Sequence, residues 1–555
     1  MAITTIRSDG SGRAARPTDR ERIETMIENP LSPGLTRRTL ISAGAGLAAA
    51  AALPGIGPVR AAAPSLVAGK RTLEVNGKAA TVFGIAGPGG RDGAVLEPGA
   101  RFAFDLVNEL GEETIIHWHG QTPPDGEDGV AGPGITPIAA GGRRPYDYAA
   151  RPGTHWMHSH HGLQEQRLLS APLIVRTAED VRADIQEVVL ILEDFTFRDP
   201  AEILAGLTAG GGHGGHGGHG GHGGHGAAAM TVTDPHAGHG MAVPVDPHAG
   251  HGKAAAPADP HAGHGMAGHG MAGHDMTGGG MPAGMVMDLN DVDYDAYLAN
   301  RRTLADPEVV RTDRGGRVRL RIINAFAATA YWIDLGGADA SLIAVDGTPV
   351  VPVAGTRFPL SMAQRIDLLV DVPAGRVVPV LAQREGDVAR TGLILAAPGA
   401  AVAKLGAAAD QAPPLDLVLE RRLRAMEPLP VRAADRTVRI DLGGGMAPYA
   451  WSLNGAFWPK PAPIHVRGGE RVMLDILNDT MMAHPMHLHG HAFQVVEIDG
   501  TPLAGAVRDT VLVAPMGRVK VVFDADNPGR WPFHCHNLYH MATGMMTDVV
   551  YEGVG

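Results

Sequence analysis

Cysteine is almost absent from this chain of 555 residues, which contains only Cys535. One cysteine cannot form a disulfide within the chain, so a disulfide-stapled scaffold is excluded. In an oxidising compartment a leftover cysteine is a hazard or a reactive group. Use of the side chain as a buried, metal-binding thiolate would resolve that difficulty.

Long apolar runs are also missing. Apart from the N-terminal region, no segment has eighteen consecutive apolar residues, which excludes a helical membrane span and predicts a soluble mature protein. Long amphipathic helices are few; residues 294–302 are a short candidate that could equally enter a strand. The chain lacks a basic excess, and its formal net charge of −12 argues against nucleic acid and anionic membranes as partners.

The chain consists instead of short β-branched segments divided by Gly, Pro and Asp turns. The clearest are Arg317–Ile323, Arg365–Val372, Val438–Leu442, Arg471–Leu477, Val519–Phe523 and Asp548–Tyr551. This alternation predicts an all-β protein built from antiparallel sandwiches. The length suggests several domains, because single hydrophobic cores rarely grow beyond about 250–300 residues.

Four His-x-His pairs lie in this β-rich pattern: His117/His119, His158/His160, His487/His489 and His534/His536. In a β-strand, residues two apart point the same way, so each pair can offer two imidazoles to one cavity. The strand would turn Cys535 towards a second site. A thiolate with two imidazoles and a distant thioether suits blue copper, and the chain offers that set in His484, Cys535, His540 and Met545.

These residues resemble the multicopper oxidases. The resemblance rests on four motifs in family order: His117-Trp118-His119-Gly120, Trp156-Met157-His158-Ser159-His160, His484-Pro485-Met486-His487-Leu488-His489-Gly490, and His534-Cys535-His536 with His540 and Gly544-Met545. It implies three consecutive cupredoxin-like Greek-key β-sandwich domains. We place them at residues 64–180, 181–400 and 410–555.

The resemblance also implies four copper ions per chain and a ligand for each position. Type 2 copper would be held by His117 and His487. One type 3 copper would be held by His119, His158 and His536, and the other by His160, His489 and His534. Type 1 copper, in the third domain, would be held by His484, Cys535 and His540, with Met545 as its weak axial ligand.

Asp128 is a candidate proton relay, because it matches an acidic position that family members use beside the three-copper cluster. Its alternative interpretation is an ordinary Asp-Gly turn residue. The acid that many bacterial relatives carry directly after the last type 1 histidine is replaced here by Met541. Four histidines outside the motif positions are interpreted as satisfied polar residues of a sheet: His155, His161, His465 and His491.

Residues 1–63 have the features of a twin-arginine signal peptide. Thr36-Arg37-Arg38-Thr39-Leu40 carries the paired arginines, a short apolar stretch follows, and Ala61-Ala62-Ala63 offers a cleavage site. These features predict export to the periplasm or secretion. The alternative is a basic, disordered N-terminus.

Residues 206–287 form a low-complexity insertion in the second predicted domain. It holds 13 of the 27 histidines, in His-Gly-Gly and Asp-Pro-His-Ala-Gly-His-Gly repeats followed by several methionines. Such a composition predicts disorder in the metal-free protein. Imidazole and thioether bind Cu(II) and Cu(I) respectively, so we interpret the insertion as a binder of extra copper. A tolerated flexible loop is the alternative.

The expected reaction is four one-electron oxidations of a small reducing substrate coupled to reduction of O2 to water. His534, Cys535 and His536 would carry the electrons from type 1 copper to the cluster. The resemblance is strongest to copper-resistance oxidases, which favours Cu(I) as substrate and a role in copper tolerance. Laccase-like oxidation of phenols or arylamines ranks second, and Mn(II) or Fe(II) oxidation third. A non-catalytic periplasmic copper-binding protein is the alternative from another class.

Overall fold

The computed structural model describes residues 63–210, 289–313 and 316–554. The predicted signal peptide and nearly all of the predicted insertion therefore lie outside the described residues. The insertion was predicted to begin at residue 206, but helix α3 (Pro200–Thr208) continues past that point. No helix among the described residues is both long enough and apolar enough to cross a membrane.

Two four-stranded sheets come first, in the strand orders β2-β1-β4-β6 and β3-β8-β7-β5. Their strands are β1 (Ser65–Val75), β2 (Lys78–Ala86), β3 (Ala94–Leu96), β4 (Arg101–Asn108), β5 (Ile116–His117), β6 (Arg143–Ala149), β7 (Gly153–Ser159) and β8 (Ser170–Val175). In β4, buried and more exposed residues alternate as a half-buried strand requires. A buried cluster that includes Phe102 and Met157 joins the two sheets.

The next two sheets have the orders β10-β9-β12-β17-β14-β15 and β11-β19-β18-β13-β16. Their strands are β9 (Gln186–Phe195), β10 (Ala296–Ala299), β11 (Val309–Arg311), β12 (Arg317–Asn324), β13 (Tyr331–Asp334), β14 (Ala340–Val345), β15 (Thr348–Gly355), β16 (Arg357–Leu360), β17 (Arg365–Asp371), β18 (Val377–Arg384) and β19 (Arg390–Ala396). Helix α2 (Ala178–Ala183) leads into β9. Residues 294–302 contain strand β10, so their helical interpretation was wrong and the strand alternative holds.

The last two sheets have the orders β21-β20-β23-β29-β25-β26, with β27 also paired to β25, and β22-β31-β30-β24-β28. Their strands are β20 (Arg436–Met446), β21 (Tyr449–Leu453), β22 (Ile464–Val466), β23 (Arg471–Asn478), β24 (His484–Leu488), β25 (Phe493–Ile498), β26 (Thr501–Pro502), β27 (Val507–Arg508), β28 (Thr510–Val513), β29 (Arg518–Asp524), β30 (Arg530–Cys535) and β31 (Met546–Tyr551). Helix α4 (Val418–Arg422) precedes these sheets, and α5 (Leu538–Ala542) follows β30.

The three pairs of sheets repeat one topology. In each pair the first strand runs parallel to its neighbour, as β1 does with β4, β9 with β12 and β20 with β23. A second parallel pairing also recurs in each, between β3 and β8, β11 and β19, and β22 and β31. This repetition confirms the predicted all-β fold of consecutive cupredoxin-like sandwiches. The exact domain boundaries remain predictions.

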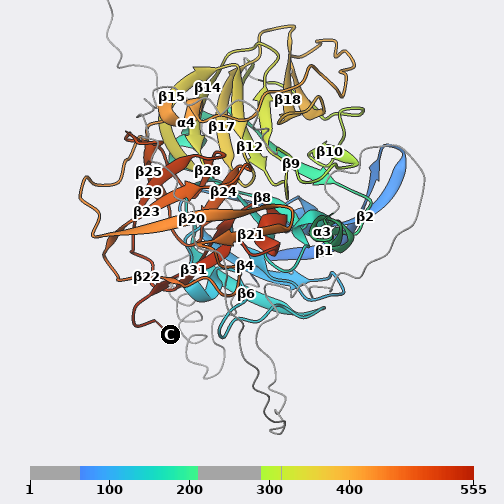
Figure 1. Cartoon of the computed structure of the whole chain (residues 1–555). Coiled ribbons are helices and arrows are strands. Elements are labelled where there is room, and N and C mark those ends of the chain that lie inside the picture. The colour runs from blue at the N-terminus through green and yellow to red at the C-terminus, as the bar shows by residue number, and fades with distance from the viewer. Residues whose placement is uncertain (1–62, 211–288, 314–315, 555) are drawn as a thin grey trace, which may run out of the picture. The chain divides into compact units, whose positions relative to one another are not determined.

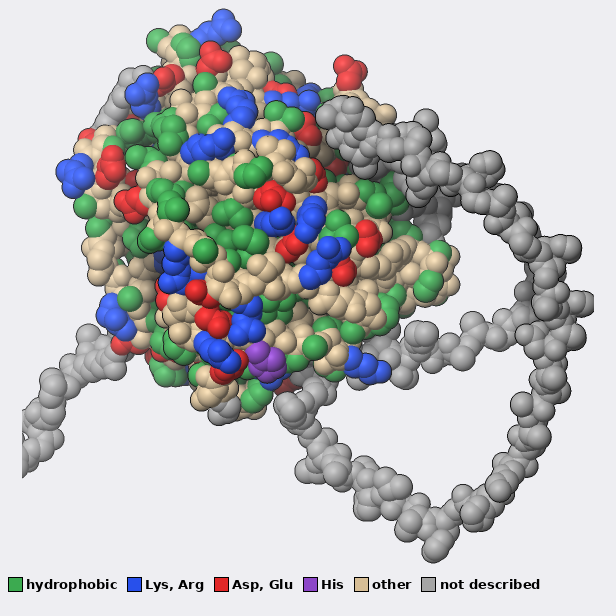
Figure 2. Space-filling model, turned by 60° about the vertical axis from the view of Figure 1, so that its left-hand side comes forward, with side chains coloured by type: hydrophobic (Ala, Val, Ile, Leu, Met, Phe, Trp, Pro, Cys, Tyr) green, Lys and Arg blue, Asp and Glu red, His purple; other side chains and the backbone are tan. Residues whose placement is uncertain are grey.

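Figure 1 shows the second pair of sheets in green and yellow at the top, with the blue strands of the first pair and the red strands of the third beneath it. Strands β5 and β7 of the first pair and β24 and β30 of the third carry the His-x-His motifs. On the face drawn in Figure 2, basic and acidic side chains are interspersed with one another.

Candidate metal centres

Each His-x-His motif lies at the end of a strand. Strand β5 ends at His117, β7 at Ser159, β24 at Leu488 and β30 at Cys535. The first histidine of every pair is therefore within the strand, and the second lies one or two residues beyond the strand's last residue. Backbone hydrogen bonds between strands continue at His160, His489 and His536, so the extended chain that the sequence predicts reaches the second histidine of these three pairs.

Strand pairing brings the first histidines of different motifs together. His117 is the partner of His158 across β5 and β7, and His487 is the partner of His534 across β24 and β30. In adjacent antiparallel strands such residues lie directly opposite one another, with their side chains on the same face. The register therefore builds two histidine pairs, one in the first and one in the third pair of sheets.

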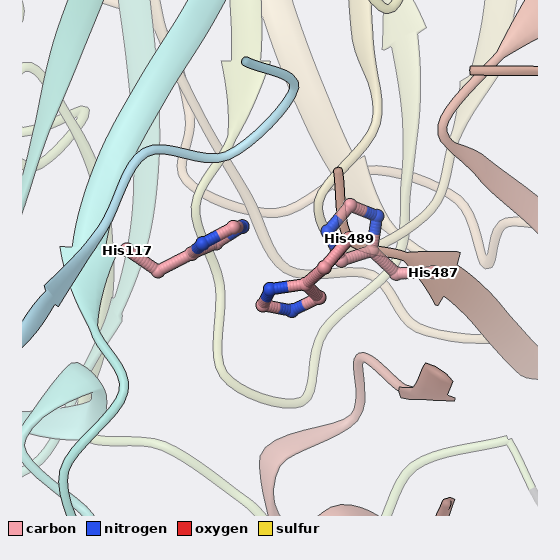
Figure 3. A group of neighbouring side chains, drawn as sticks. All are labelled: His117, His487 and His489. Atoms are coloured by element: carbon pink, nitrogen blue, oxygen red, sulfur yellow. The ribbon is translucent and has the colours of Figure 1, made fainter. Parts of the chain in front are cut away.

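The two pairs meet in one buried space. The ring of His117 stacks on that of His489 and the ring of His119 on that of His487, each with 3.8 Å between ring centroids. Figure 3 shows His117 approaching from the first pair of sheets, and His487 and His489 from the third. Their candidate ligand atoms lie within 4.8 Å of one another. All of these side chains are buried.

The remaining predicted cluster ligands surround this space. The ligand atoms of two further trios lie within 4.8 Å of one another: His117, His119 and His158, and His160, His489 and His534. The centroid of the His536 ring is 5.0 Å from those of both His119 and His158. The structure thus brings all eight predicted cluster histidines together, and the third trio matches one predicted type 3 set in full.

The buried imidazoles are held in the neutral form that metal binding requires. Burial is the largest cause, and it lowers the pKa well below the ordinary value for His119, His158, His484, His487, His489 and His536. Nearby imidazoles lower these pKa values further, because each protonated ring would repel the next. The cluster therefore presents lone pairs rather than a block of positive charge.

Hydrogen bonds to one ring nitrogen direct the other towards the shared space. His117 donates from Nδ1 to the backbone oxygen of Asp128 at 2.9 Å, and His487 donates from Nδ1 to that of Asp509 at 2.8 Å. The Nε2 atoms of both rings are buried and make no hydrogen bond. A buried nitrogen without a partner costs free energy unless something binds it. These two atoms fit a metal ion.

His158 follows the same pattern through a carboxylate: its Nδ1 lies 2.8 Å from Glu165 Oε2, and its Nε2 has no hydrogen-bond partner. His119 is reversed. Its Nε2 donates to Asp509 Oδ1 at 3.1 Å, which leaves Nδ1 as the buried nitrogen without a partner. Metal-binding histidines commonly donate their second N–H to a carboxylate or carbonyl in this way. The donor set therefore fits the copper cluster that the sequence predicts.

The second predicted set lies on the other side of β30. Cys535 Sγ is 3.7 Å from His484 Nδ1 and 3.6 Å from His540 Nδ1, and the two nitrogens are 3.0 Å apart. All three side chains are fully buried. Burial raises the pKa of the Cys535 thiol, and the Asn537 N–H, which points at the sulfur from 3.4 Å, lowers it only in part. A bound cation would supply the charge that a buried thiolate needs.

Met545, the residue before β31, adjoins Cys535 and His540. Its side chain is fully buried, its N–H donates to the His540 carbonyl at 3.0 Å, and its carbonyl accepts from the Cys535 N–H at 3.1 Å. Trp451 packs on the other flank, with its ring centroid 4.2 Å from that of His540. A buried thiolate and two imidazoles, with a buried methionine bonded to the backbone of both Cys535 and His540, fit the donor set of a blue-copper electron-transfer site.

Asp128 lies directly beside the cluster. His489 donates from Nδ1 to Asp128 Oδ2 at 2.8 Å, and Asp128 Oδ1 is 3.4 Å from His117 Nδ1. Oδ1 is buried without a hydrogen-bond partner. The residue thus contacts predicted ligands of two different copper ions, and its role as a proton relay stays a prediction.

Three carboxylates beside the sites had not been predicted from the sequence. Asp509 contacts His119, Glu165 contacts His158, and Asp291 Oδ2 lies 3.1 Å from His540 Nε2. None follows a recognisable spacing from its histidine. Only Asp509 offered a signal, because it lies in a β-rich, apolar segment, where an acidic residue is rarely buried without a partner.

The four remaining histidines described here stand apart from the donor sets. His491 donates from Nδ1 to the His489 carbonyl and contacts Tyr551 Oη through Nε2. His155 lies 3.1 Å from the Pro152 carbonyl. His161 is half-buried near Glu113, and His465 is exposed. His491 is a satisfied polar residue as predicted, whereas His155 Nδ1 and His161 Nδ1 are buried without a hydrogen-bond partner.

Comparison with known proteins shows the family. Residues 69–180, 265–378 and 432–553 match three models that are each described as multicopper oxidase. The multicopper oxidase MmcO of Mycobacterium tuberculosis is 30% identical, over 82% of this chain and 80% of that protein. A copper resistance protein A homolog of Pseudomonas syringae is 25% identical, over 93% of this chain and 99% of that protein.

Solved structures share the fold. A multi-copper oxidase from Pseudomonas thermotolerans superposes with a TM-score of 0.59 at 22% identity, over 88% of this chain and 98% of that one. Fet3p, a multicopper oxidase that functions in iron import, gives a TM-score of 0.65 at 17% identity, over 88% and 90%. At such identities the likeness concerns the fold alone. From its family matches and its MmcO relative, the chain belongs to the multicopper oxidase family of oxidoreductases.

Proposed function

We propose that this protein oxidises a small reducing substrate one electron at a time beside Cys535 and reduces O2 to water at the histidine cluster, with Cu(I) as the favoured substrate. One observation carries the proposal: the Cys535 donor set and the eight-histidine space are buried on opposite sides of the single tripeptide His534-Cys535-His536. Copper bound at these positions would supply the redox chemistry. The chain itself would hold the copper ions, connect the two sites and supply protons.

The ligand assignment follows the sequence prediction. Type 2 copper is assigned to His117 and His487. One type 3 ion is assigned to His119, His158 and His536, and the other to His160, His489 and His534. Type 1 copper is assigned to His484, Cys535, His540 and Met545. The burial of every one of these side chains supports the assignment.

The backbone around Cys535 provides the connection between the two sites. His534 and His536 are its covalent neighbours, so each path is one residue long. His534 also donates from Nδ1 to the Cys535 carbonyl at 2.9 Å, which shortens one of these paths by a hydrogen bond. Displacing the cysteine by one position would remove both connections.

Protons for water formation come from carboxyl groups at the cluster. Asp128 touches His489 and His117, and Glu165 touches His158. Met541 follows His540, where many relatives carry an acid, so Asp128 has the larger share of this task.

A small cavity beside the Cys535 site favours Cu(I) over organic donors. Met362, Met482 and Glu385 line it, and so do Ala483 and Asn537, which adjoin the predicted ligands His484 and His536 in the chain. Thioether sulfur is a soft ligand that prefers Cu(I). Burial raises the pKa of Glu385 to about 7, so this carboxyl can be neutral or charged near neutral pH.

The flanks of the His/Met-rich segment also lie near this site. Ile203 and Leu204 of α3 and Val292 belong to the same buried cluster as Cys535 and Met545, and Leu289 lines the cavity itself. In the sequence, the predicted copper-binding insertion, residues 206–287, directly adjoins these residues. This supports a copper-tolerance role in the periplasm after twin-arginine export, in keeping with similarity to proteins named copper resistance protein A.

The test compares electron donors for copper-loaded, full-length protein. The protein is reduced without air, reoxidised with air, and then supplied in turn with Cu(I), 2,6-dimethoxyphenol, Fe(II) or Mn(II) while O2 uptake is followed. We expect Cu(I) to give the highest kcat/KM. Cys535→Ser is the control and should abolish uptake with all donors. A faster reaction with the phenol would favour the laccase alternative.

Met482→Leu tests the cavity at nearly constant side-chain volume. The KM for Cu(I) should rise while that for 2,6-dimethoxyphenol stays unchanged. Met426→Leu is the matched control, because Met426 is 60% exposed and lies outside the cavity.

Full copper loading without O2 uptake from any donor would contradict catalysis and favour a copper-binding protein.

A further inference from the structure

Arg365, the first residue of β17, reaches from the second pair of sheets to the histidine cluster. Its side chain is fully buried. Nη1 and Nη2 donate to the two carboxylate oxygens of Asp509 at 2.7 and 2.5 Å, and Nε donates to the Thr154 carbonyl at 3.2 Å. Thr154 belongs to the first pair of sheets and Asp509 to the third. One guanidinium therefore ties three parts of the molecule together.

Asp509, held in place by Arg365, accepts hydrogen bonds from two predicted copper ligands. Its carboxylate accepts from His119 Nε2 at 3.1 Å, and its backbone carbonyl accepts from His487 Nδ1 at 2.8 Å. Thr510 donates from Oγ1 to Asp509 Oδ1 at 3.0 Å and lies 3.2 Å from His119 Nε2. The position of Asp509 thus sets the orientation of imidazoles that come from the first and the third pairs of sheets.

The space around this contact is closed. Gly120 follows His119 with a φ of +84°, and a Cβ atom there would lie 2.5 Å from Arg365 Nη2 and 2.9 Å from Asp509 Oδ2. The guanidinium has no room to move towards the histidine motif. Only glycine combines this backbone conformation with such a close approach.

The chemistry requires arginine. Burying a carboxylate or guanidinium costs several kcal/mol, and removing Arg365 would leave Asp509 with Arg151, 3.7 Å from Oδ2, as its remaining guanidinium partner. The planar guanidinium offers parallel N–H groups that match both oxygens of a carboxylate, whereas a lysine ammonium acts as a point charge. Lysine would keep the charge and lose the fixed orientation of Asp509.

We propose that Arg365 is a positioning residue of the three-copper centre, supplied by the pair of sheets that contributes none of its ligands, and that it acts by fixing Asp509 against His119 and His487. This inference rests on the proposed function, because it assumes that the eight histidines hold copper. Arg365 touches neither O2 nor substrate, and its contribution is geometric.

Arg365→Lys is the test, and Arg321→Lys is its matched control. Arg321 is also fully buried, lies on the neighbouring strand β12, and bonds Thr154 Oγ1, Asp367 and Glu187 without contacting a cluster histidine. Both variants should lower Tm. Copper is titrated into each metal-free, full-length protein while the blue band of the Cys535 site and the type 2 EPR signal are followed separately.

For Arg365→Lys we expect the blue band to form at wild-type copper concentrations and the type 2 signal to need about 10–100-fold more copper, the usual cost of losing a group that orients a metal ligand. Arg321→Lys should keep both signals. Equal behaviour of the two variants, or wild-type type 2 affinity in Arg365→Lys, would overturn the inference. A wild-type protein with neither signal would overturn the proposed function and the inference with it.

If Arg365→Lys does not fold, Arg365→Gln replaces it in the same titration, because the amide can still donate one hydrogen bond to Asp509 without the positive charge. We expect a weakened type 2 signal and an intact blue band there too. Loss of both signals together in a folded Arg365→Gln protein would overturn the inference, since it would indicate general disruption rather than positioning.

Discussion

His487 and His534 lie directly opposite one another in strands β24 and β30, and the adjoining partners in the same register are Met486 and Cys535. Consecutive residues of a strand point to opposite faces. Neighbouring residues of β30 therefore belong to different sites. His534 faces the histidine cluster, and Cys535 faces His484 and His540. A one-residue slip in this pairing would exchange the two environments.

Asp128→Asn should slow O2 reduction while leaving the blue band intact. The amide keeps the shape of the side chain but cannot take up and release a proton, and loss of a proton-transfer group costs about 10²–10⁴-fold in rate. The measurement is steady-state O2 uptake beside the absorption spectrum. Normal turnover would contradict the predicted relay and leave Asp128 as a hydrogen-bond acceptor for His489 and His117.

Glu165→Gln should weaken copper binding at the cluster by about 10–100-fold, because His158 loses the carboxyl group that orients its ring. The contact of 2.8 Å between Glu165 and His158 Nδ1 motivates this expectation. Copper dissociation from the loaded protein in the presence of a chelator measures the effect. Glu113→Gln is the control, because Glu113 is exposed. Unchanged dissociation from the Glu165 variant would contradict the prediction.

Glu385 should make the protein less stable as the pH rises from 4.5 towards 7. Burial raises the pKa of Glu385 from 4.5 to about 7, so in this range the unfolded chain has lost a proton that the folded protein retains. Raising the pH then favours unfolding, by about 3 kcal/mol over the whole range at roughly 1.4 kcal/mol per pKa unit. In Glu385→Gln this loss should disappear.

The measurement for Glu385 is the free energy of unfolding at several pH values for the wild type, for Glu385→Gln and for Glu109→Gln. Glu109 is exposed and serves as the control. The stability curve of the Glu385 variant should be flatter between pH 4.5 and 7 than the other two. Three parallel curves would contradict the prediction.

The metal-free protein should lose stability as the pH falls below 6.5. Burial lowers the pKa of the cluster histidines, such as His119 and His489, well below that ordinary value. Below pH 6.5 the histidines of the unfolded chain bind protons, whereas the buried histidines of the folded protein stay neutral. Lowering the pH therefore favours unfolding. Tm of copper-free Glu385→Gln protein, which lacks the opposite contribution of Glu385, is measured across this range and checks the sign. A constant Tm would mean that the imidazoles are not closely packed in solution.

Most of the fold could be predicted because its strands carry a local signal. Alternating β-branched residues placed a strand at Arg471–Leu477, and β23 runs from Arg471 to Asn478. The predicted segment Val519–Phe523 lies within β29 in the same way. Residues 294–302 were ambiguous because Tyr and Leu occur in both helices and strands, and pairing with β9 decides in favour of a strand.

The candidate ligands were predictable because each motif is short and contiguous, and His-x-His needs no knowledge of distant parts of the chain. Their partners were not predictable for the opposite reason. Asp509 contacts His119 across 390 residues of chain, and Arg365 contacts Asp509 across 144. Such pairs follow from the packing of separate sandwiches, and no spacing within one segment encodes them.

The meeting of His160 and His534, which are 374 residues apart in the chain, has a thermodynamic consequence. An ion shared between the first and last sandwiches would act as a cross-link that closes a very long loop, and such closure restricts the denatured chain most strongly when the loop is long. Calorimetry should therefore distinguish the two forms of the protein. The metal-loaded protein should melt in one sharp, cooperative peak, and the metal-free protein should melt in broader, separable domain transitions.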